Sequence, residues 1–151
     1  MTAPPVLVAG VGNPDRGDDG FGPAVIARLA ALALPGVATV VCPRPLDLLD
    51  HWPGRERVFV VDAAAPGEEP GRLRRIEPLR GAVASASSAS THGLGLAETI
   101  ELGRSLGRLP RQLVLYVAEA SSFVHGAPLS APVAAAVEEA ARRIAEECRR
   151  G

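Results

Sequence analysis

Residues 6–32, VLVAGVGNPDRGDDGFGPAVIARLAAL, join a short apolar run to a helical pattern through a loop rich in glycine and aspartate. The apolar run at residues 6–10 ends on glycine and predicts a buried strand. Pro23 suits the first turn of a helix. Apolar residues then recur at helical spacing, namely Val25, Ile26, Leu29 and Leu32. The order strand, loop, helix is typical of the units from which α/β sheets are built.

The same alternation continues along the chain. Further strands are predicted at residues 37–42, 57–62, 72–76 and 112–117, with an edge-like strand at 72–76. Helices are predicted at residues 46–49, at 94–106 and after Ser130, which can cap the last helix, and residues 81–91 are predicted to form a loop. Because the strands are continuous apolar runs, we expect an α/β fold. The expected architecture is a three-layer sandwich, in which helices cover both faces of a twisted, mostly parallel five-stranded sheet.

Length and composition restrict the function. A chain of 151 residues without an internal repeat or linker fits one domain spanning residues 1–151. The net charge of −1 is not the basic field expected of a nucleic-acid-binding protein. No apolar run reaches the roughly 18 residues of a membrane span, and no basic region typical of a secretory signal is expected at the N-terminus. Cys42 and Cys148 are too far apart for a disulfide framework or a zinc knuckle, which favours the cytoplasm.

The candidates for chemistry stand where ligands of such sheets bind, beyond the carboxyl ends of the strands. Asp18 and Asp19 follow the first strand, Asp62 ends the third, and His92 precedes a helix. Each also has a simpler interpretation. Asp18 or Asp19 could cap the next helix, and Asp62 could start a turn by hydrogen bonding into residues 63–65. His92 could simply face solvent at a helix entrance.

These side chains favour a cation over a phosphate. The first loop lacks GxxxxGK[ST], and its aspartates would repel a phosphate. Two carboxylates and an imidazole form a mixed oxygen and nitrogen ligand set, and three protein ligands leave positions open for a substrate. A Cys42–His92 nucleophile is a weaker alternative, because a cysteine at a strand end is usually inert packing. The GxSxG motif of a serine hydrolase is absent from the sequence.

Three segments resemble the signatures of the hydrogenase maturation proteases. They are GVGNPDRGDDGFG at residues 10–22, Asp62 at the end of the third strand, and THGLGL at residues 91–96. The C-terminal part is also similar to the family's pattern, at Glu119, Phe123, Gly126, Leu129, Ser130 and Val133. The resemblance covers nearly the whole chain in the right order, and it implies a twisted five-stranded sheet flanked by helices.

The resemblance implies an endopeptidase that removes the C-terminal extension of a NiFe hydrogenase large-subunit precursor after nickel insertion. It implies that Asp19, Asp62 and His92 contact the nickel, which the precursor supplies, and carry the catalysis. Asp19 holds a position often filled by glutamate, so either the loop sits closer or Asp18 shares the task. The expected substrate contacts are Asn13, Arg16, Asp18, Arg44 and Glu119. The enzyme is expected to be a monomer before it meets its substrate.

Residues 42–45, CPRP, depart from the family's pattern, in which an acidic residue and glycines often follow the second strand. Proline restricts this loop and Arg44 reverses its charge, which leaves the identity of the substrate open. Two other functions are alternatives. A peptidyl-tRNA hydrolase shares the opening GxGNP, but Arg16, Asp18 and Asp19 stand where an aromatic residue and a histidine are expected. A non-catalytic chaperone could grip a metal with the same three residues.

Overall fold

The computed structural model describes residues 4–80 and 95–151, and a five-stranded sheet lies at its centre. The strands are β1 (Val6–Val11), β2 (Val37–Cys42), β3 (Arg57–Ala64), β4 (Leu73–Ile76) and β5 (Gln112–Glu119). They lie in the order β2-β1-β3-β5-β4, and all neighbours are parallel except β4, which runs antiparallel to β5. The mostly parallel sheet and its edge-like fourth strand are therefore confirmed.

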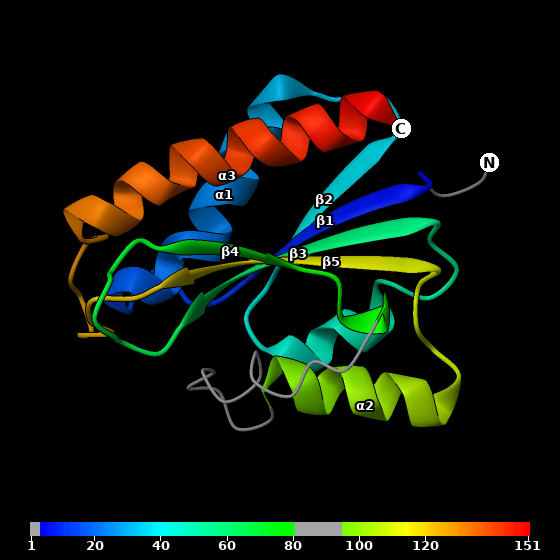
Figure 1. The fold of residues 1–151 in the computed structure, drawn as a ribbon, viewed down its shortest axis with the longest axis horizontal. Coiled ribbons are helices and arrows are strands. Elements are labelled where there is room, and N and C mark those ends of the chain that lie inside the picture. The colour runs from blue at the N-terminus through cyan, green and yellow to red at the C-terminus, as the bar shows by residue number, and fades with distance from the viewer. Residues whose placement is uncertain (1–3, 81–94) are drawn as a thin grey trace.

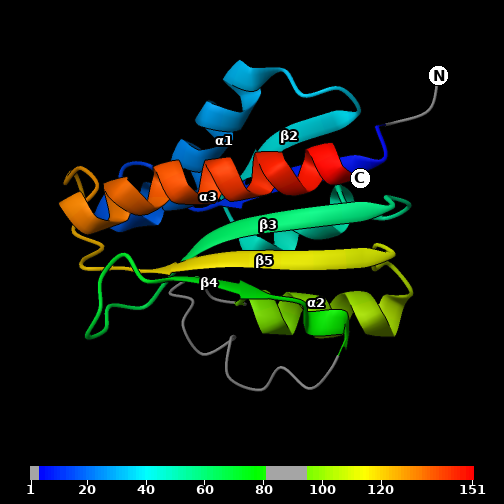
Figure 2. The same ribbon diagram turned by 45° about the horizontal axis from the view of Figure 1, so that its top comes forward.

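Helices cover both faces of this twisted sheet, as Figures 1 and 2 show. On one face lie α1 (Phe21–Leu32) and α3 (Ala131–Arg150), and on the other lies α2 (Leu96–Leu106). Three short 3₁₀ helices complete the described elements, η1 (Gly17–Gly20), η2 (Pro45–Asp50) and η3 (Pro78–Arg80), and η2 packs against α2. The predicted three-layer arrangement is confirmed.

Each face of the sheet has its own apolar core. Val8, Phe59 and Tyr116 point from the strands towards α1 and α3, and the alternate residues of the same strands point towards η2 and α2. The buried stripe of α3 includes Val133, Val137, Ala141 and Ile144. Trp52 is fully buried in the second core, although the adjacent His51 is exposed. Because both faces of the sheet are buried, each strand contributes apolar side chains to both cores, which explains its continuous apolar sequence.

Two local predictions were wrong. β3 does not end at Asp62 but continues to Ala64, because β5 runs beside it and pairs Asp62 with Val117 and Ala64 with Glu119. Ser130 stands at the N-cap position of α3, but its side chain does not cap the helix. It donates instead to the carboxylate of Asp18, at 2.9 and 3.1 Å. The predicted loop at residues 81–91 lies outside the described residues.

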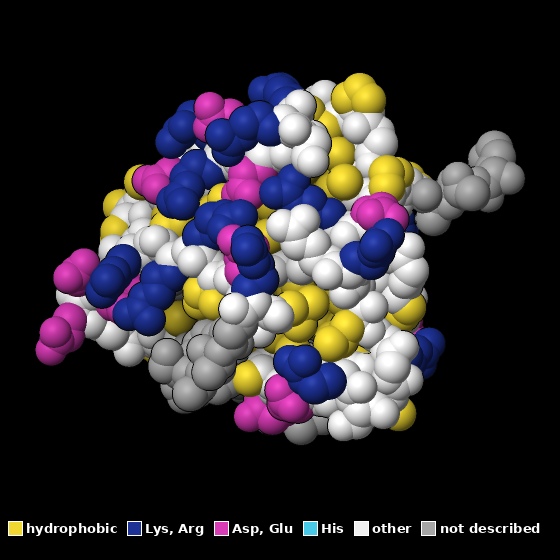
Figure 3. All heavy atoms as spheres, turned by 45° about the vertical axis from the view of Figure 1, so that its right-hand side comes forward, with side chains coloured by type: hydrophobic (Ala, Val, Ile, Leu, Met, Phe, Trp, Pro, Cys, Tyr) yellow, Lys and Arg dark blue, Asp and Glu magenta, His cyan; other side chains and the backbone are white. Residues whose placement is uncertain are grey.

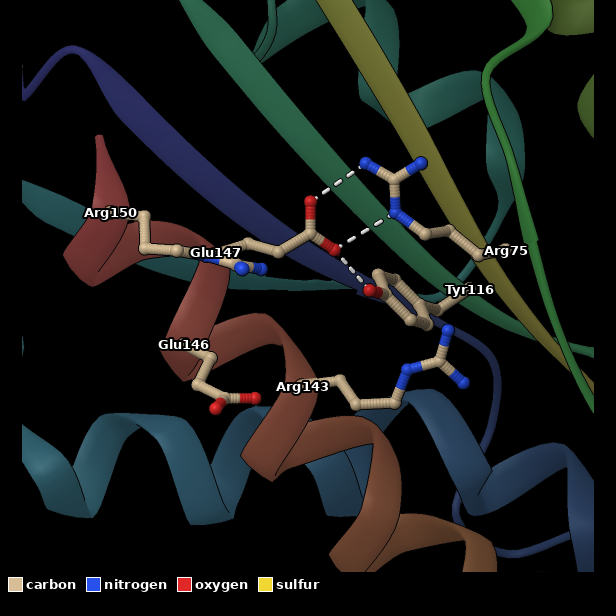
Figure 4. A pocket seen from close by; sticks show the side chains of 6 residues that line it. All are labelled: Arg75, Tyr116, Arg143, Glu146, Glu147 and Arg150. Carbon is tan, nitrogen blue, oxygen red and sulfur yellow. Dashed lines mark hydrogen bonds and ion pairs between the residues drawn. The ribbon is translucent and has the colours of Figure 1, made fainter.

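A buried carboxylate holds the C-terminal end of α3 to the sheet. Glu147 accepts hydrogen bonds from Arg57 of β3, at 3.0 Å, and from Arg75 of β4, at 2.7 and 2.9 Å. Tyr116 of β5 also donates its hydroxyl to it, as Figure 4 shows. Burial alone would raise the pKa of the Glu147 carboxyl, but the hydrogen bonds from Arg75 and Tyr116 and the charge of Arg57 outweigh it and lower the pKa. The negative charge of Glu147 is thus compensated by the two arginines of this cluster.

Basic and acidic side chains are interspersed on the surface that Figure 3 shows. Ion pairs along the outer side of α3 include Arg143 with Glu139 at 3.2 Å and Arg142 with Glu146 at 3.5 Å. Screened pairs of this kind contribute little to stability. Among the helices of the described residues, none combines the length and the apolar character needed to cross a membrane.

Candidate active site

The site lies where the neighbouring strands β1 and β3 separate at their carboxyl ends, which leaves an opening between them. Their ladder has its last pair at Gly10 and Val61, after which Val11 pairs with Cys42 of β2 and Asp62 pairs with Val117 of β5. The chain leaves β1 towards β2 and returns to β3 on the other side, so this is the point at which the strand order reverses. Open parallel sheets bind their ligands at such a point, beyond the carboxyl ends of the strands.

Glycine allows the first loop to pack directly onto this opening. A Cβ atom on Gly22, in the first turn of α1, would lie 2.5 Å from the carbonyl oxygen of Val11 and 2.6 Å from that of Val61. Gly12 has a φ of 138°, and a Cβ there would lie 2.0 Å from the carbonyl oxygen of Asp19. Larger residues at either position would push the loop away from the sheet. The glycines therefore bring η1 and its aspartates to the opening.

Asp19 is buried in η1, with 1% of its surface exposed. Its Oδ2 accepts a hydrogen bond from the backbone N–H of Asn13 at 3.0 Å, and Nη1 of Arg16 lies 3.9 Å from the same oxygen. The carboxylate does not cap α1, whose N-cap residue is Gly20 without a side-chain cap. The helix-capping interpretation of Asp19 is thus not what the structure shows.

Asp62 is the second buried carboxylate, with 3% of its surface exposed. Its Oδ1 accepts a hydrogen bond from the N–H of Ala63 at 2.8 Å, as the turn interpretation expected, but the residue lies within a strand. Because η1 packs against β3, Asp19 and Asp62 belong to segments in contact at the same end of the sheet. Burying two carboxylates there is costly in free energy, and such a cost is typical of a functional site.

Asp18 lies next to Asp19 but holds a different part of the fold. Its carboxylate accepts hydrogen bonds from the backbone of Ser121, Ser122 and Ser130, at 2.7, 3.3 and 2.7 Å, and from the Ser130 hydroxyl. These contacts tie the first loop to the loop between β5 and α3. Sequence reasoning did not identify this role of the serines, although the resemblance included Ser130. The sequence signal for a separate role of Asp18 was its position next to Asp19 in one loop.

A hollow of about 430 Å³ brings together three of the expected substrate contacts, Asn13, Arg16 and Arg44, of which Asn13 and Arg16 also contact Asp19. Arg16 also lies over the ring of Phe123, 6.0 Å from its centre, and Arg44 pairs with Asp47 at 3.0 Å. The remaining lining residues were not predicted; they are Gly12, Pro14, Val41 and Pro43. No signal in the sequence pointed to them, because the exposure of Val41 and the edge position of β2 are known only from the structure.

The other predicted residues lie elsewhere. Asp18 and Glu119 do not line this hollow, and the Glu119 carboxylate accepts from the backbone N–H of Glu69 in the loop before β4. His92 lies outside the described residues. Within residues 4–80 and 95–151, no three His, Cys, Asp or Glu side chains are grouped to hold a metal ion. Of the predicted ligand set, the described residues therefore include Asp19 and Asp62.

Cys42 does not have the properties of a nucleophile. The residue is 1% exposed at the end of β2. Burial, followed by the negative charges of Asp47 and Asp50, raises the pKa of its thiol to about 12. A catalytic cysteine needs the thiolate, which these surroundings disfavour. The carboxylates are the better candidates for the chemistry.

Comparison with known proteins identifies the family. The family model described as hydrogenase maturation protease matches residues 43–147. The hydrogenase expression/formation protein HupD of Bradyrhizobium diazoefficiens is 33% identical over 135 residues, covering 85% of this chain and 69% of that protein.

Solved structures agree in fold. The hydrogenase 2 maturation peptidase of Thaumarchaeota archaeon SCGC_AB-539-E09 is 32% identical, with a TM-score of 0.68 over 94% of this chain and 96% of that one. The NiFe hydrogenase maturation protease HycI of Thermococcus kodakarensis is 27% identical, with a TM-score of 0.69 over 97% and 93% of the two chains. With this fold and this family match, the chain belongs to the hydrogenase maturation protease family.

Proposed function

We propose that this peptidase removes the C-terminal extension of a NiFe hydrogenase large-subunit precursor after nickel has been inserted. The observation that carries the proposal is the pair of buried carboxylates, Asp19 and Asp62, on touching segments at the opening between β1 and β3. The adjoining hollow offers room for a polypeptide segment. The relatives whose names include hydrogenase maturation support the choice of substrate.

In this proposal Asp19, Asp62 and His92 are the catalytic and metal-contacting residues, and the nickel arrives with the precursor. Carboxylate oxygens and an imidazole nitrogen form a donor set that suits nickel. Such a metal can polarise the scissile carbonyl or lower the pKa of a bound water. Asp19 is held by the N–H of Asn13 and Asp62 by that of Ala63, so each carboxylate is oriented before the substrate binds. Either carboxylate could then accept the proton of the attacking water.

The remaining predicted residues take different roles in the proposal. Asn13, Arg16 and Arg44 line the hollow and contact the precursor. Asp18 acts as a positioning residue, because its oxygens already accept hydrogen bonds from the loop before α3. Glu119 positions the loop before β4 through Glu69.

We assign the reaction to the cytoplasm and to a monomer. Cys42 and Cys148 are free thiols, as expected in a reducing compartment. The interspersed charges of Figure 3 favour a protein substrate over a nucleic acid.

The test is a processing assay with nickel-loaded and nickel-free precursor, followed by mass spectrometry. Loss of the C-terminal extension is expected only with nickel and wild-type enzyme, and Asp62→Asn is expected to abolish it while the circular dichroism spectrum stays unchanged. Undiminished cleavage by Asp62→Asn would remove Asp62 from the mechanism. Binding of the nickel-loaded precursor by the wild-type chain without any change of mass would favour the chaperone.

A further inference from the structure

One margin of the sheet is open beside the active site. Among the described strands β2 pairs with β1 alone, and it forms the edge of the sheet, as Figure 2 shows. The carbonyl oxygens of Gly36 and Cys42 accept from Val6 and Gly12, at 3.3 and 3.1 Å, and so point towards β1. Since successive residues of a strand point their backbone groups to opposite sides, Val37, Thr39 and Val41 point theirs outward.

The outward groups of Thr39 and Val41 are available for pairing. The N–H of Val37 donates to Leu34 in the preceding turn, at 3.3 Å. The N–H and C=O groups of Thr39 and Val41 have no hydrogen-bond partner among the residues that the structure describes. Two adjacent outward residues of an edge strand are the pattern that an added strand requires.

β2 also lacks two features that normally protect an edge, namely charged residues and proline. Residues 37–41, VATVV, contain neither a charged residue nor proline, and all but the alanine favour strands. The side chain of Val41 is exposed, with 42% of its surface accessible. The opposite margin, β4, carries Arg74 and Arg75. Proteins usually blunt exposed edges with charges, proline or bulges, so an unprotected edge favours a binding partner.

The edge leads directly into the active site. Val41, Pro43 and Arg44 form the wall of the hollow that continues β2. Asn13 and Arg16 line the same hollow, and both contact the carboxylate of Asp19. A peptide paired with β2 would therefore run into the hollow and reach the catalytic carboxylates in an extended conformation.

We infer that β2 binds the precursor's segment next to the scissile bond as an added strand, through the backbone groups of Thr39 and Val41. This inference rests on the proposed function, since the occupant is the protein substrate of the peptidase. Main-chain hydrogen bonds supply affinity for an extended segment and hold its scissile bond in register with the site. The alternative occupant of such an edge, a second copy of this chain, is tested below.

The first test compares two substitutions at one position. Val41→Pro removes the outward N–H but leaves the bonds between β2 and β1, because Val40 and Cys42 make them, and edge strands tolerate proline there. Its kcat/KM on nickel-loaded precursor is expected to fall about tenfold, the effect of roughly 1.4 kcal/mol of lost binding. Val41→Thr keeps the N–H and a similar shape, so its kcat/KM is expected to exceed that of Val41→Pro about tenfold. Thermal melting of both variants verifies that they are folded.

The second test measures the protection of the β2 backbone amides in the absence of catalysis. Asp62→Asn enzyme is mixed with nickel-loaded precursor, and amide hydrogen exchange is followed by NMR. Thr39 and Val41 are expected to gain protection, whereas Ala38 and Val40, which already bond to β1, are the controls. Unchanged exchange at Thr39 and Val41, or equal rates for the two Val41 variants, would overturn the inference. So would protection that rises with enzyme concentration alone, which would identify a dimer.

The outcomes separate the two proposals. If the wild-type enzyme binds the precursor and protects the edge but leaves the mass unchanged, the proposed function fails and the edge inference stands. If the wild-type enzyme cuts the precursor and both readouts at β2 are negative, only the edge inference fails.

Discussion

Asp18 and Asp19 are adjacent in the chain, yet their carboxylates have different partners. Asp18 accepts from Ser121, Ser122 and Ser130, and Asp19 accepts from Asn13 beside the hollow. An asparagine at position 18 would place an N–H₂ group against these donors. We therefore expect Asp18→Asn to lower the free energy of unfolding by about 2 kcal/mol.

Asp19→Asn is the matched comparison, because an amide oxygen can still accept from Asn13. It is expected to lower the free energy of unfolding by less than about 1 kcal/mol but to abolish processing. Urea denaturation and the mass assay measure the two effects. A stable but inactive Asp18→Asn together with an active Asp19→Asn would reverse the assignment of ligand and positioning residue.

At the scale of elements, the contact between α1 and the sheet depends on Gly22. A methyl group there would lie 2.5–2.6 Å from two carbonyl oxygens of β1 and β3, which are backbone atoms and cannot rotate away. Gly22→Ala is expected to cost about 3 kcal/mol of stability and to reduce processing, because η1 would move with α1. Gly103→Ala in α2 is the control.

Gly103 is also a helical glycine, but the atoms nearest to its added methyl would belong to side chains and not to the backbone. The ends of Leu109 and Leu49 would lie at 3.0 and 3.2 Å, and the ring of Trp52 would lie at 3.5 Å, an ordinary contact distance. Alanine also favours a helix by about 1 kcal/mol. Gly103→Ala is therefore expected to change the urea midpoint little and to leave processing intact. Equal effects of the two substitutions would mean that the backbone contact at Gly22 is unimportant.

The charged carboxylate of Glu147 holds α3 to the sheet, so this attachment depends on pH. Because the pKa of Glu147 is lowered in the folded state, its contribution to stability is full above the unfolded value of about 4.3. That contribution is lost as the pH falls through the lower folded value. Glu147→Gln removes the counter-charge of Arg57 and one of the two carboxylates paired with Arg75, the other being Glu77, and is expected to cost about 3 kcal/mol at pH 7.

The difference in melting temperature between wild type and Glu147→Gln is therefore expected to narrow from pH 6 to pH 3. Glu146→Gln is the control, since its carboxylate is exposed and pairs with Arg142 at 3.5 Å. It should change stability by less than about 0.5 kcal/mol. A constant difference across this pH range would contradict the role of the Glu147 charge.

At the scale of the molecule, the elements were predictable from sequence because their signals are local. The run at residues 58–61 identified β3, but its continuation past Asp62 depends on β5, which lies about 50 residues away in the chain. The helix start at Ser130 was predicted, but the partner of its hydroxyl, Asp18, comes from the opposite end of the chain. Asp19 and Asp62 were found because Asp19 follows the first predicted strand and Asp62 ends the third predicted strand, although β3 in fact continues to Ala64. The hollow was not predicted, because it is formed jointly by the end of β2 and the first loop, which are distant in the sequence.

The assembled site also makes a prediction about metal. If nickel arrives with the precursor, the isolated chain gains no stability from a resident ion. Its two apolar cores and the hydrogen bonds that orient Asp19 and Asp62 are already formed by protein groups. Dialysis against EDTA is therefore expected to change the melting temperature by less than about 1 °C. A resident ion at a hundred times its Kd would contribute about 2.7 kcal/mol, which is several degrees. After removal of EDTA, the same enzyme should process nickel-loaded precursor at the undialysed rate. A lower melting temperature that added Ni²⁺ restores would instead make nickel a resident cofactor of the enzyme.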